Sequence, residues 1–162
     1  MKIIIAGGGE VGFHLAKLLS SESLDITLID SDKERLHYAE SHLDIRALYG
    51  DAMSLSIMEE AKVVNSDLFI AVTAEESINI TICAIAKQLG CKRTIARISN
   101  IELIKAQDRI SFQDIGVDEL ISPEELAAEE IQQLLDQSAF SNSYEFEGGA
   151  LTLIGTRLEE EV

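Results

Sequence analysis

Short apolar runs alternate with stretches of helical spacing along the first 122 residues. In the helical stretches apolar residues recur every three or four positions, as in Val11, Leu15, Leu18 and Leu19, which is typical of a helix with one buried face. Strands separated by helices pair in parallel. The pattern therefore predicts an α/β fold, a Rossmann-like doubly wound parallel sheet of about six strands. The predicted strands cover residues 2–6, 26–30, 45–49, 68–72, 93–98 and 119–121.

A glycine-rich turn follows the first predicted strand and leads into a helix. Gly7 permits a tight turn, Gly9 leaves room for the backbone to approach phosphates, and Gly12 lets the helix pack closely on the strand. A helix N-terminus offers amide hydrogens to an anion, so this arrangement is typical of a pyrophosphate site. The Gly-Lys-Ser or Gly-Lys-Thr string of a P-loop is absent. The candidate binding residues of the turn are Gly7, Gly8, Gly9, Glu10, Val11 and Gly12.

A carboxylate ends the second predicted strand at Asp30, eighteen residues after Gly12. In dinucleotide sites a carboxylate near this position accepts a hydrogen bond from the ribose 2′-hydroxyl. The 2′-phosphate of NADP would be repelled there, and the sequence places no arginine beside Asp30. We therefore expect NAD or NADH in preference to NADP.

Other candidate residues follow later strands, at the edge where parallel sheets bind ligands. They are Asp51, Thr73, Ala74 and Arg97. An arginine at the end of an apolar strand is costly unless it meets an anion, so Arg97 is expected to contact a ligand or to pair with Asp51. Asp51 fits a ligand contact and a cap of the following helix equally well. Thr73 fits either a phosphate donor or a helix cap.

Acidic residues dominate the charge of the chain, with 29 Asp and Glu against 13 Lys and Arg and a net charge of −16. This balance repels nucleic acid and anionic lipid, so we expect neither as a direct partner. Acidic runs are typical of solvated faces, although an acidic surface also suits the basic cytoplasmic loops of a membrane protein.

The sequence contains neither a signal peptide nor an apolar run long enough to cross a bilayer, which predicts a cytoplasmic protein. The two cysteines, Cys83 and Cys91, lack the spacing of a metal or redox motif, and we expect buried thiols at both positions. We expect no metal site and no catalytic residue.

A helix with an apolar stripe is predicted after Pro123. Its residues Leu126, Ile131, Leu134 and Leu135 recur at helical spacing, with Glu and Gln on the opposite face. Such a stripe serves either a core or an interface between subunits. Beyond it, the alternation around Gly148-Gly149 predicts a short β extension of hairpin form.

The combination of these motifs resembles the RCK or KTN domain family, which regulates potassium transport. Within the family, the chain is similar to the N-terminal part of the peripheral regulatory subunits of bacterial Trk-type potassium uptake systems. The resemblance covers residues 1–140 approximately and depends on strings outside the glycine turn. They are Gly50-Asp51-Ala52, Leu68-Phe-Ile-Ala-Val-Thr73-Ala-Glu-Glu76, Asn79, Ile95-Ala-Arg97 and Val117-Asp-Glu-Leu-Ile-Ser-Pro123-Glu124.

The resemblance implies a regulatory subunit and not an enzyme. The implied ligands are NAD, NADH and, as in some members, ATP or ADP. Domains of this family pair into dimers and rings whose shape biases a membrane-embedded potassium transporter subunit. The protein would therefore act at the inner face of the cell membrane, through its partner and without inserting itself. The implied ligand contacts are Gly7 to Val11, Asp30, Asp51, Thr73, Ala74 and Arg97.

The resemblance also implies three parts. Residues 1–122 would form a Rossmann nucleotide-binding domain, and residues 123–141 a crossover and dimerisation helix. Residues 142–162 would be the start of a truncated C-terminal ligand domain.

Two other functions fit the same fold. An NAD-dependent oxidoreductase would need a substrate domain and a proton-transfer residue. The three histidines, His14, His37 and His42, fall on the first two predicted helices and away from the expected cleft. A soluble nucleotide sensor with another partner differs only in that partner.

Overall fold

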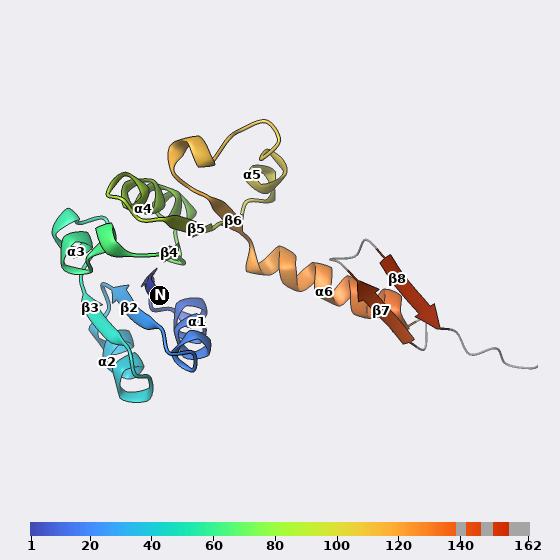
Figure 1. Cartoon of the computed structure of the whole chain (residues 1–162), viewed down its shortest axis with the longest axis horizontal. Helices are drawn as coiled ribbons and strands as arrows, with labels where there is room; N and C mark the ends of the chain where they lie inside the picture. The colour runs from blue at the N-terminus through green and yellow to red at the C-terminus, as the bar shows by residue number, and fades with distance from the viewer. Residues whose placement is uncertain (139–141, 147–150, 156–162) are drawn as a thin grey trace, which may run out of the picture. The chain divides into compact units, whose positions relative to one another are not determined.

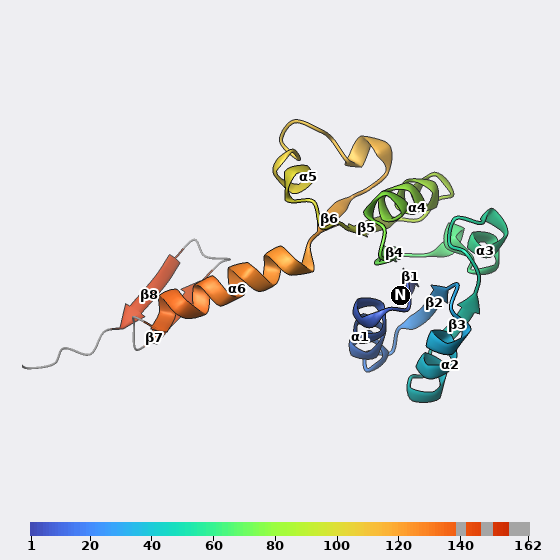
Figure 2. The same cartoon turned by 180° about the vertical axis from the view of Figure 1, so that it is seen from behind.

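The structure is a computed structural model that describes residues 1–138, 142–146 and 151–155. The chain divides into two compact units, residues 1–122 and residues 123–162. Figures 1 and 2 show the first unit as a sheet with helices on its faces, and the second as one helix and a pair of strands.

Six parallel strands form the sheet of the first unit, in the order β3-β2-β1-β4-β5-β6. This is the strand order of dinucleotide-binding folds, with the change of winding direction between β1 and β4. The predicted Rossmann-like parallel sheet is confirmed. The strands are β1 (Lys2–Ala6), β2 (Asp25–Asp30), β3 (Arg46–Tyr49), β4 (Leu68–Ala71), β5 (Arg93–Arg97) and β6 (Glu119–Ile121).

The spacing predicts a helix capped at Ser31-Asp32 that ends near residue 42, and helices over residues 54–61, 75–89 and 101–107. The observed helices occur there, with ends that differ by one or two residues. They are α1 (Glu10–Ser20), α2 (Lys33–His42), α3 (Leu55–Glu60), α4 (Glu76–Gln88) and α5 (Ile101–Lys105), with short 3-10 turns at Val63–Asn65 and Gln113–Ile115. Asp32 caps α2, since its side chain accepts hydrogen bonds from the amides of Glu34 and Arg35.

The sheet is buried on both faces, because alternate side chains of each central strand enter different clusters. Ile3 and Ile5 of β1 pack with Ala16 of α1. Ile4, between them, packs in the other cluster with Ile82 of α4. Because all six strands are parallel, their carboxyl ends lie at one edge of this buried sheet.

Both cysteines are buried thiols, as predicted. Burial raises the pKa of the Cys83 thiol to about 12, so this group stays protonated at neutral pH. It therefore serves packing and not thiolate chemistry.

The second unit contains α6 (Pro123–Ser138) and the antiparallel strands β7 (Asn142–Phe146) and β8 (Leu151–Gly155). The predicted helix and β extension are both present, while residues 139–141 and the turn at Gly148-Gly149 lie outside the described residues. None of the helices in the part of the chain that the structure describes has the length and apolar character that a bilayer crossing requires.

Candidate functional site

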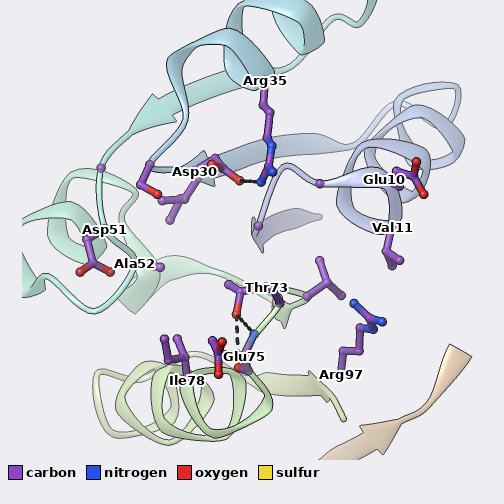
Figure 3. A pocket seen from close by; sticks show the side chains of 17 residues that line it. Glu10, Val11, Asp30, Arg35, Asp51, Ala52, Thr73, Glu75, Ile78 and Arg97 are labelled. Carbon is purple, nitrogen blue, oxygen red and sulfur yellow. Dashed lines mark hydrogen bonds and ion pairs between the residues drawn. The ribbon is translucent and has the colours of Figure 1, made fainter. Parts of the chain in front are cut away.

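A cleft of about 540 Å³ opens at the carboxyl ends of β1, β2, β4 and β5 (Figure 3). Its volume is typical of sites for small molecules and cofactors. The predicted site residues all line this cleft except Gly8 and Gly12. Folding thus brings together residues from the first strand to the fifth.

Two glycines shape the turn between β1 and α1 in the way that the sequence predicts. Gly7 has a φ of +108°, and a Cβ there would lie 2.9 Å from the Thr73 amide nitrogen. A Cβ on Gly12 would overlap the Gly7 carbonyl oxygen. Glycine is therefore required at both positions, at Gly7 for the backbone conformation and at Gly12 for the close packing of α1.

Gly9 faces open space at the N-terminus of α1. A Cβ on Gly9 would have no neighbour within 4 Å. Gly9 is the N-cap of α1 and makes no side-chain hydrogen bond to the helix. Gly9 therefore provides no side chain to cap the first amides of α1. An anion in the cleft would meet the positive end of the helix dipole.

Asp30 lies at the end of β2 and is only 8% exposed. Its Oδ1 accepts a hydrogen bond from the Asp32 amide at 2.7 Å, and its Oδ2 accepts one from the Gly8 amide. A Cβ on Gly8 would lie 3.2 Å from that Oδ2, so Gly8 permits the close approach of the turn to the carboxylate. A carboxylate has further lone pairs, which leaves Asp30 able to accept from a ribose hydroxyl.

Arg35 lies beside Asp30, which makes the expectation of no arginine there wrong. Its Nη1 is 3.8 Å from Asp30 Oδ2, and its Nε is 3.5 Å from Asp32 Oδ2. Figure 3 shows the side chain extending from α2 toward Asp30. The first turn of α2, capped by Asp32, folds the chain back over the end of β2, and this reversal brings a residue five positions later to the carboxylate.

Asp51 and Arg97 line the cleft at opposite ends (Figure 3), which excludes the ion pair considered between them. The Asp51 carboxylate accepts a hydrogen bond from the Met53 amide at 2.8 Å. It orders the turn that leads into α3, whose N-cap is Ser54 and not Asp51. Thr73 lies between the two ends, and its hydroxyl donates to Asn79 Oδ1 at 2.7 Å.

Eight further residues line the cleft outside the predicted set, and three of them, Arg35, Glu75 and Ile78, contribute side chains from helices or their caps. The other five are Ile29, Ser31, Gly50, Ala52 and Val72. Glu75 is the N-cap of α4 and Ile78 lies in its first turn, and α4 is the next element after β4. Their signal in the sequence is position alone, because the first turn after a strand end faces the ligand edge of a parallel sheet. Glu75 adds a carboxylate to the cleft and Ile78 an apolar surface.

A comparison with known families matches residues 3–123 to the TrkA-N domain. The chain belongs to the TrkA-N domain family. The TrkA-N relative named Trk system potassium uptake protein TrkA, from Haemophilus influenzae, is 39% identical over 137 residues. The match covers 83% of this chain and 30% of that protein, so the chain spans less than a third of the relative's length.

Solved structures of TrkA-N and RCK domains share the fold. The TrkA-N domain of the inner membrane protein ybaL from Escherichia coli has a TM-score of 0.72 at 20% identity, over 83% of this chain and 96% of that one. The RCK domain of GsuK has a TM-score of 0.68 at 23% identity, over 85% and 28%. GsuK bound to NAD and GsuK bound to ADP match with TM-scores of 0.68 and 0.67. The predicted resemblance to RCK domains is thereby confirmed at the level of the fold.

Proposed function

We propose that this chain is the nucleotide-binding part of a regulatory subunit that gates a potassium transporter or channel in the membrane. NAD or NADH, or alternatively ATP or ADP, would bind in the cleft and favour one conformation of an oligomeric assembly. The observation that carries the proposal is the meeting of the open α1 N-terminus at Gly9 with the buried Asp30 carboxylate in one cleft.

The lining residues suit an extended nucleotide. The diphosphate would lie against the turn from Gly7 to Val11, and the Asp30 carboxylate would accept from the ribose. In Figure 3, Asp51 and Ala52 lie on the Asp30 side of the cleft, which leaves that end for the base. Arg97 lies toward the other end, where its positive charge would meet a phosphate.

Arg35 does not convert the site to NADP. Its guanidinium is shared between two carboxylates, those of Asp30 and Asp32, so the group of three retains a net negative charge. The Arg35 side chain is also 55% exposed, which lets solvent screen it. We therefore infer a preference for NAD and NADH over NADP.

Regulation fits the cleft better than catalysis does. None of the three histidines, all of which the structure describes, lines it. A regulator needs only a difference in affinity between two conformations, and a coupling of about 1–3 kcal/mol is typical. The name of the Haemophilus relative, a potassium uptake protein, supports a potassium transporter as the partner.

The remaining expectations belong to the same proposal. The chain would pair through α6 into a homodimer and then a ring, and would lie in the cytoplasm against a membrane-embedded transporter subunit. Residues 1–122 would carry the nucleotide, residues 123–141 the dimer contact, and residues 142–162 the beginning of a further ligand domain. The net charge of −16 suits a basic cytoplasmic face of the partner.

Calorimetric titration with NAD, NADH, ADP, ATP and NADP tests the binding half of this proposal. Asp30→Asn should weaken binding of NAD or ADP about tenfold or more, because a hydrogen bond to a charged acceptor is lost. Asp25→Asn is the matched control, since Asp25 is an exposed aspartate at the opposite end of the same strand.

A folded wild-type chain that binds none of these nucleotides would contradict the proposal. Equal losses in both variants would contradict the role of Asp30, and turnover of NADH seen by absorbance would favour an oxidoreductase. Potassium flux through a reconstituted Trk-type transporter, measured with the chain and with or without NADH, tests the gating half. Flux that does not respond to NADH, ADP or ATP would contradict gating.

A further inference from the structure

Asn79 is a polar side chain that is almost completely buried, at 1% exposure, in the first half of α4. Burying an amide costs free energy unless its hydrogen bonds are replaced. Here its oxygen and its nitrogen are both fully used. Oδ1 accepts from the amide and the hydroxyl of Thr73, at 2.9 and 2.7 Å. Nδ2 donates to the carbonyl oxygens of Thr73 and Arg97, at 3.1 and 2.9 Å.

These partners lie at the carboxyl ends of two neighbouring strands, since Thr73 comes after β4 and Arg97 is the last residue of β5. The hydrogen-bonded register of β4 and β5 ends at the pair Ala71 and Ala96. Beyond that pair Asn79 bridges the two chains through its side chain, where their paired register has ended. Thr73 and Arg97 both line the cleft, whereas Asn79 does not.

The Thr73 hydroxyl has a single proton and two acceptors within the chain, Asn79 Oδ1 at 2.7 Å and the Glu75 carbonyl oxygen at 3.3 Å, of which Asn79 is the nearer. This hydroxyl therefore holds the loop after β4 in place and does not offer its proton to a phosphate in this conformation. The bond to the Arg97 carbonyl fixes the backbone from which the arginine side chain extends. One buried amide thus sets the distance between the loop at Thr73 and the base of Arg97.

We infer that Asn79 is a positioning residue for the phosphates of the bound nucleotide. It touches no ligand and acts through the loop at Thr73 and through Arg97. The inference rests on the proposed nucleotide-binding function and extends it. Because Asp30 and Asp51 lie on other elements, Asn79 should affect the phosphate-binding end of the cleft and leave the nucleoside end unchanged.

The test compares ADP with adenosine in the Asn79→Ser variant. Serine is neutral, so it adds no charge near the phosphates, and its hydroxyl is too short to reach both strands. We expect the affinity for ADP to fall about tenfold, as the loss of one well-placed ionic contact would produce, while the affinity for adenosine changes less than about twofold. A general loss of structure would lower both affinities, so the ratio of the two separates positioning from stability.

Thr81→Ala is the matched control. Thr81 is an exposed residue of the same helix, and its hydroxyl donates to the Ser77 carbonyl within α4. Asn79→Ala provides a second variant if the serine protein does not fold. Combined with Arg97→Ala, it should add little to the loss caused by Arg97→Ala alone, because coupled residues are not additive.

An unchanged affinity for ADP, or an equal fall for ADP and adenosine, would overturn the role of Asn79. Full additivity with Arg97→Ala would do the same. Failure of the wild-type chain to bind ADP and NAD would instead overturn the proposed function, and thermal unfolding of each variant shows which proteins are folded.

Discussion

Single glycines at the β1–α1 turn have separable tasks. Gly12 contacts the turn itself, where a Cβ would overlap the Gly7 carbonyl oxygen. A Cβ on Gly9 would have no neighbour within 4 Å, and Gly9 lines the cleft. Its φ of −67° and ψ of −170° are open to any residue, so the backbone does not require glycine there. We therefore propose that the space beside Gly9 is the part of the turn that a ligand occupies.

Gly9→Ala and Gly12→Ala should consequently fail in different ways. We expect Gly9→Ala to keep the fold, with a loss of about 1 kcal/mol or less in the free energy of unfolding, because alanine is a poorer N-cap. Its affinity for ADP should fall at least tenfold, about 1.4 kcal/mol, because the methyl group occupies the space of a phosphate. Gly12→Ala should lose about 2 kcal/mol or more of stability through overpacking.

Thermal unfolding and calorimetry check both variants. ADP binding that survives in Gly9→Ala would contradict the placement of the phosphates at the turn. A fully stable Gly12→Ala protein would contradict the close packing of α1.

At the scale of elements, α4 makes contacts near both the carboxyl ends and the amino ends of the strands that it covers. Near its N-terminus, the Glu76 carboxylate accepts hydrogen bonds from the Ser99 and Asn100 amides, both at 3.0 Å. Near its C-terminus, Lys87 Nζ lies 2.7 Å from Asp118 Oδ2, which also accepts from the Thr94 amide at 2.8 Å. The first set of contacts adjoins the cleft, and the second lies at the amino ends of β5 and β6. Changes to the second set should alter stability alone.

Asp118→Asn should lower the free energy of unfolding by about 1–2 kcal/mol at neutral pH, since it removes the acceptor charge that Lys87 and Thr94 share. Partial burial opposes ionisation of Asp118, but the hydrogen bonds from Lys87 and Thr94 outweigh it and hold its pKa below the usual value. A lowered folded-state pKa contributes stability above the unfolded pKa of about 3.9, and this stability is lost as the pH falls through the folded pKa.

The difference between wild type and Asp118→Asn should therefore be full at pH 7 and shrink below about pH 4. Denaturant unfolding at several pH values measures it, with ADP affinity as the control that should not change. A difference that stays constant into acid would show that the charge of Asp118 is not the source of the stability.

At the scale of the whole molecule, the second unit presents an apolar surface. The side chains of Leu126, Ile131, Leu134 and Leu135 on α6 are 57%, 58%, 57% and 66% exposed. Four large apolar side chains on one helix are unusual for a surface that stays in water. A second copy of the chain would bury them, which is the dimer of the proposed function.

Leu134→Asp should shift the chain from dimer to monomer in light scattering, because a charge in a buried apolar contact is costly. Gln132→Asp is the matched control: it adds the same charge on the opposite face of α6 and should leave the mass of the dimer unchanged. The same mass for wild type and Leu134→Asp would exclude this stripe as the interface.

The predictions from the sequence agree most closely with the structure for features that a short stretch of residues determines. Apolar runs and helical spacing locate the strands and helices to within one or two residues, and the glycine turn with Asp30 marks the cleft. Arg35, Glu75 and Ile78 were not predicted as lining residues, because each depends on how a helix leaves the strand before it. The ion pair considered between Asp51 and Arg97 does not form for a related reason. The order of the strands in the sheet, and not their order in the chain, sets the separation of these two residues.

The sequence alone determined the class of fold and the edge of the sheet at which the cleft opens, because parallel strands bring their carboxyl ends to one side whatever the details of packing. Only the tertiary structure decided which side chains meet there. Arg35 reaches Asp30 because α2 folds back over β2. Asn79 joins Thr73 to Arg97, which lies eighteen residues after Asn79, because α4 packs across β4 and β5. Contacts of this kind depend on the relative placement of packed elements, which no local pattern of residues encodes.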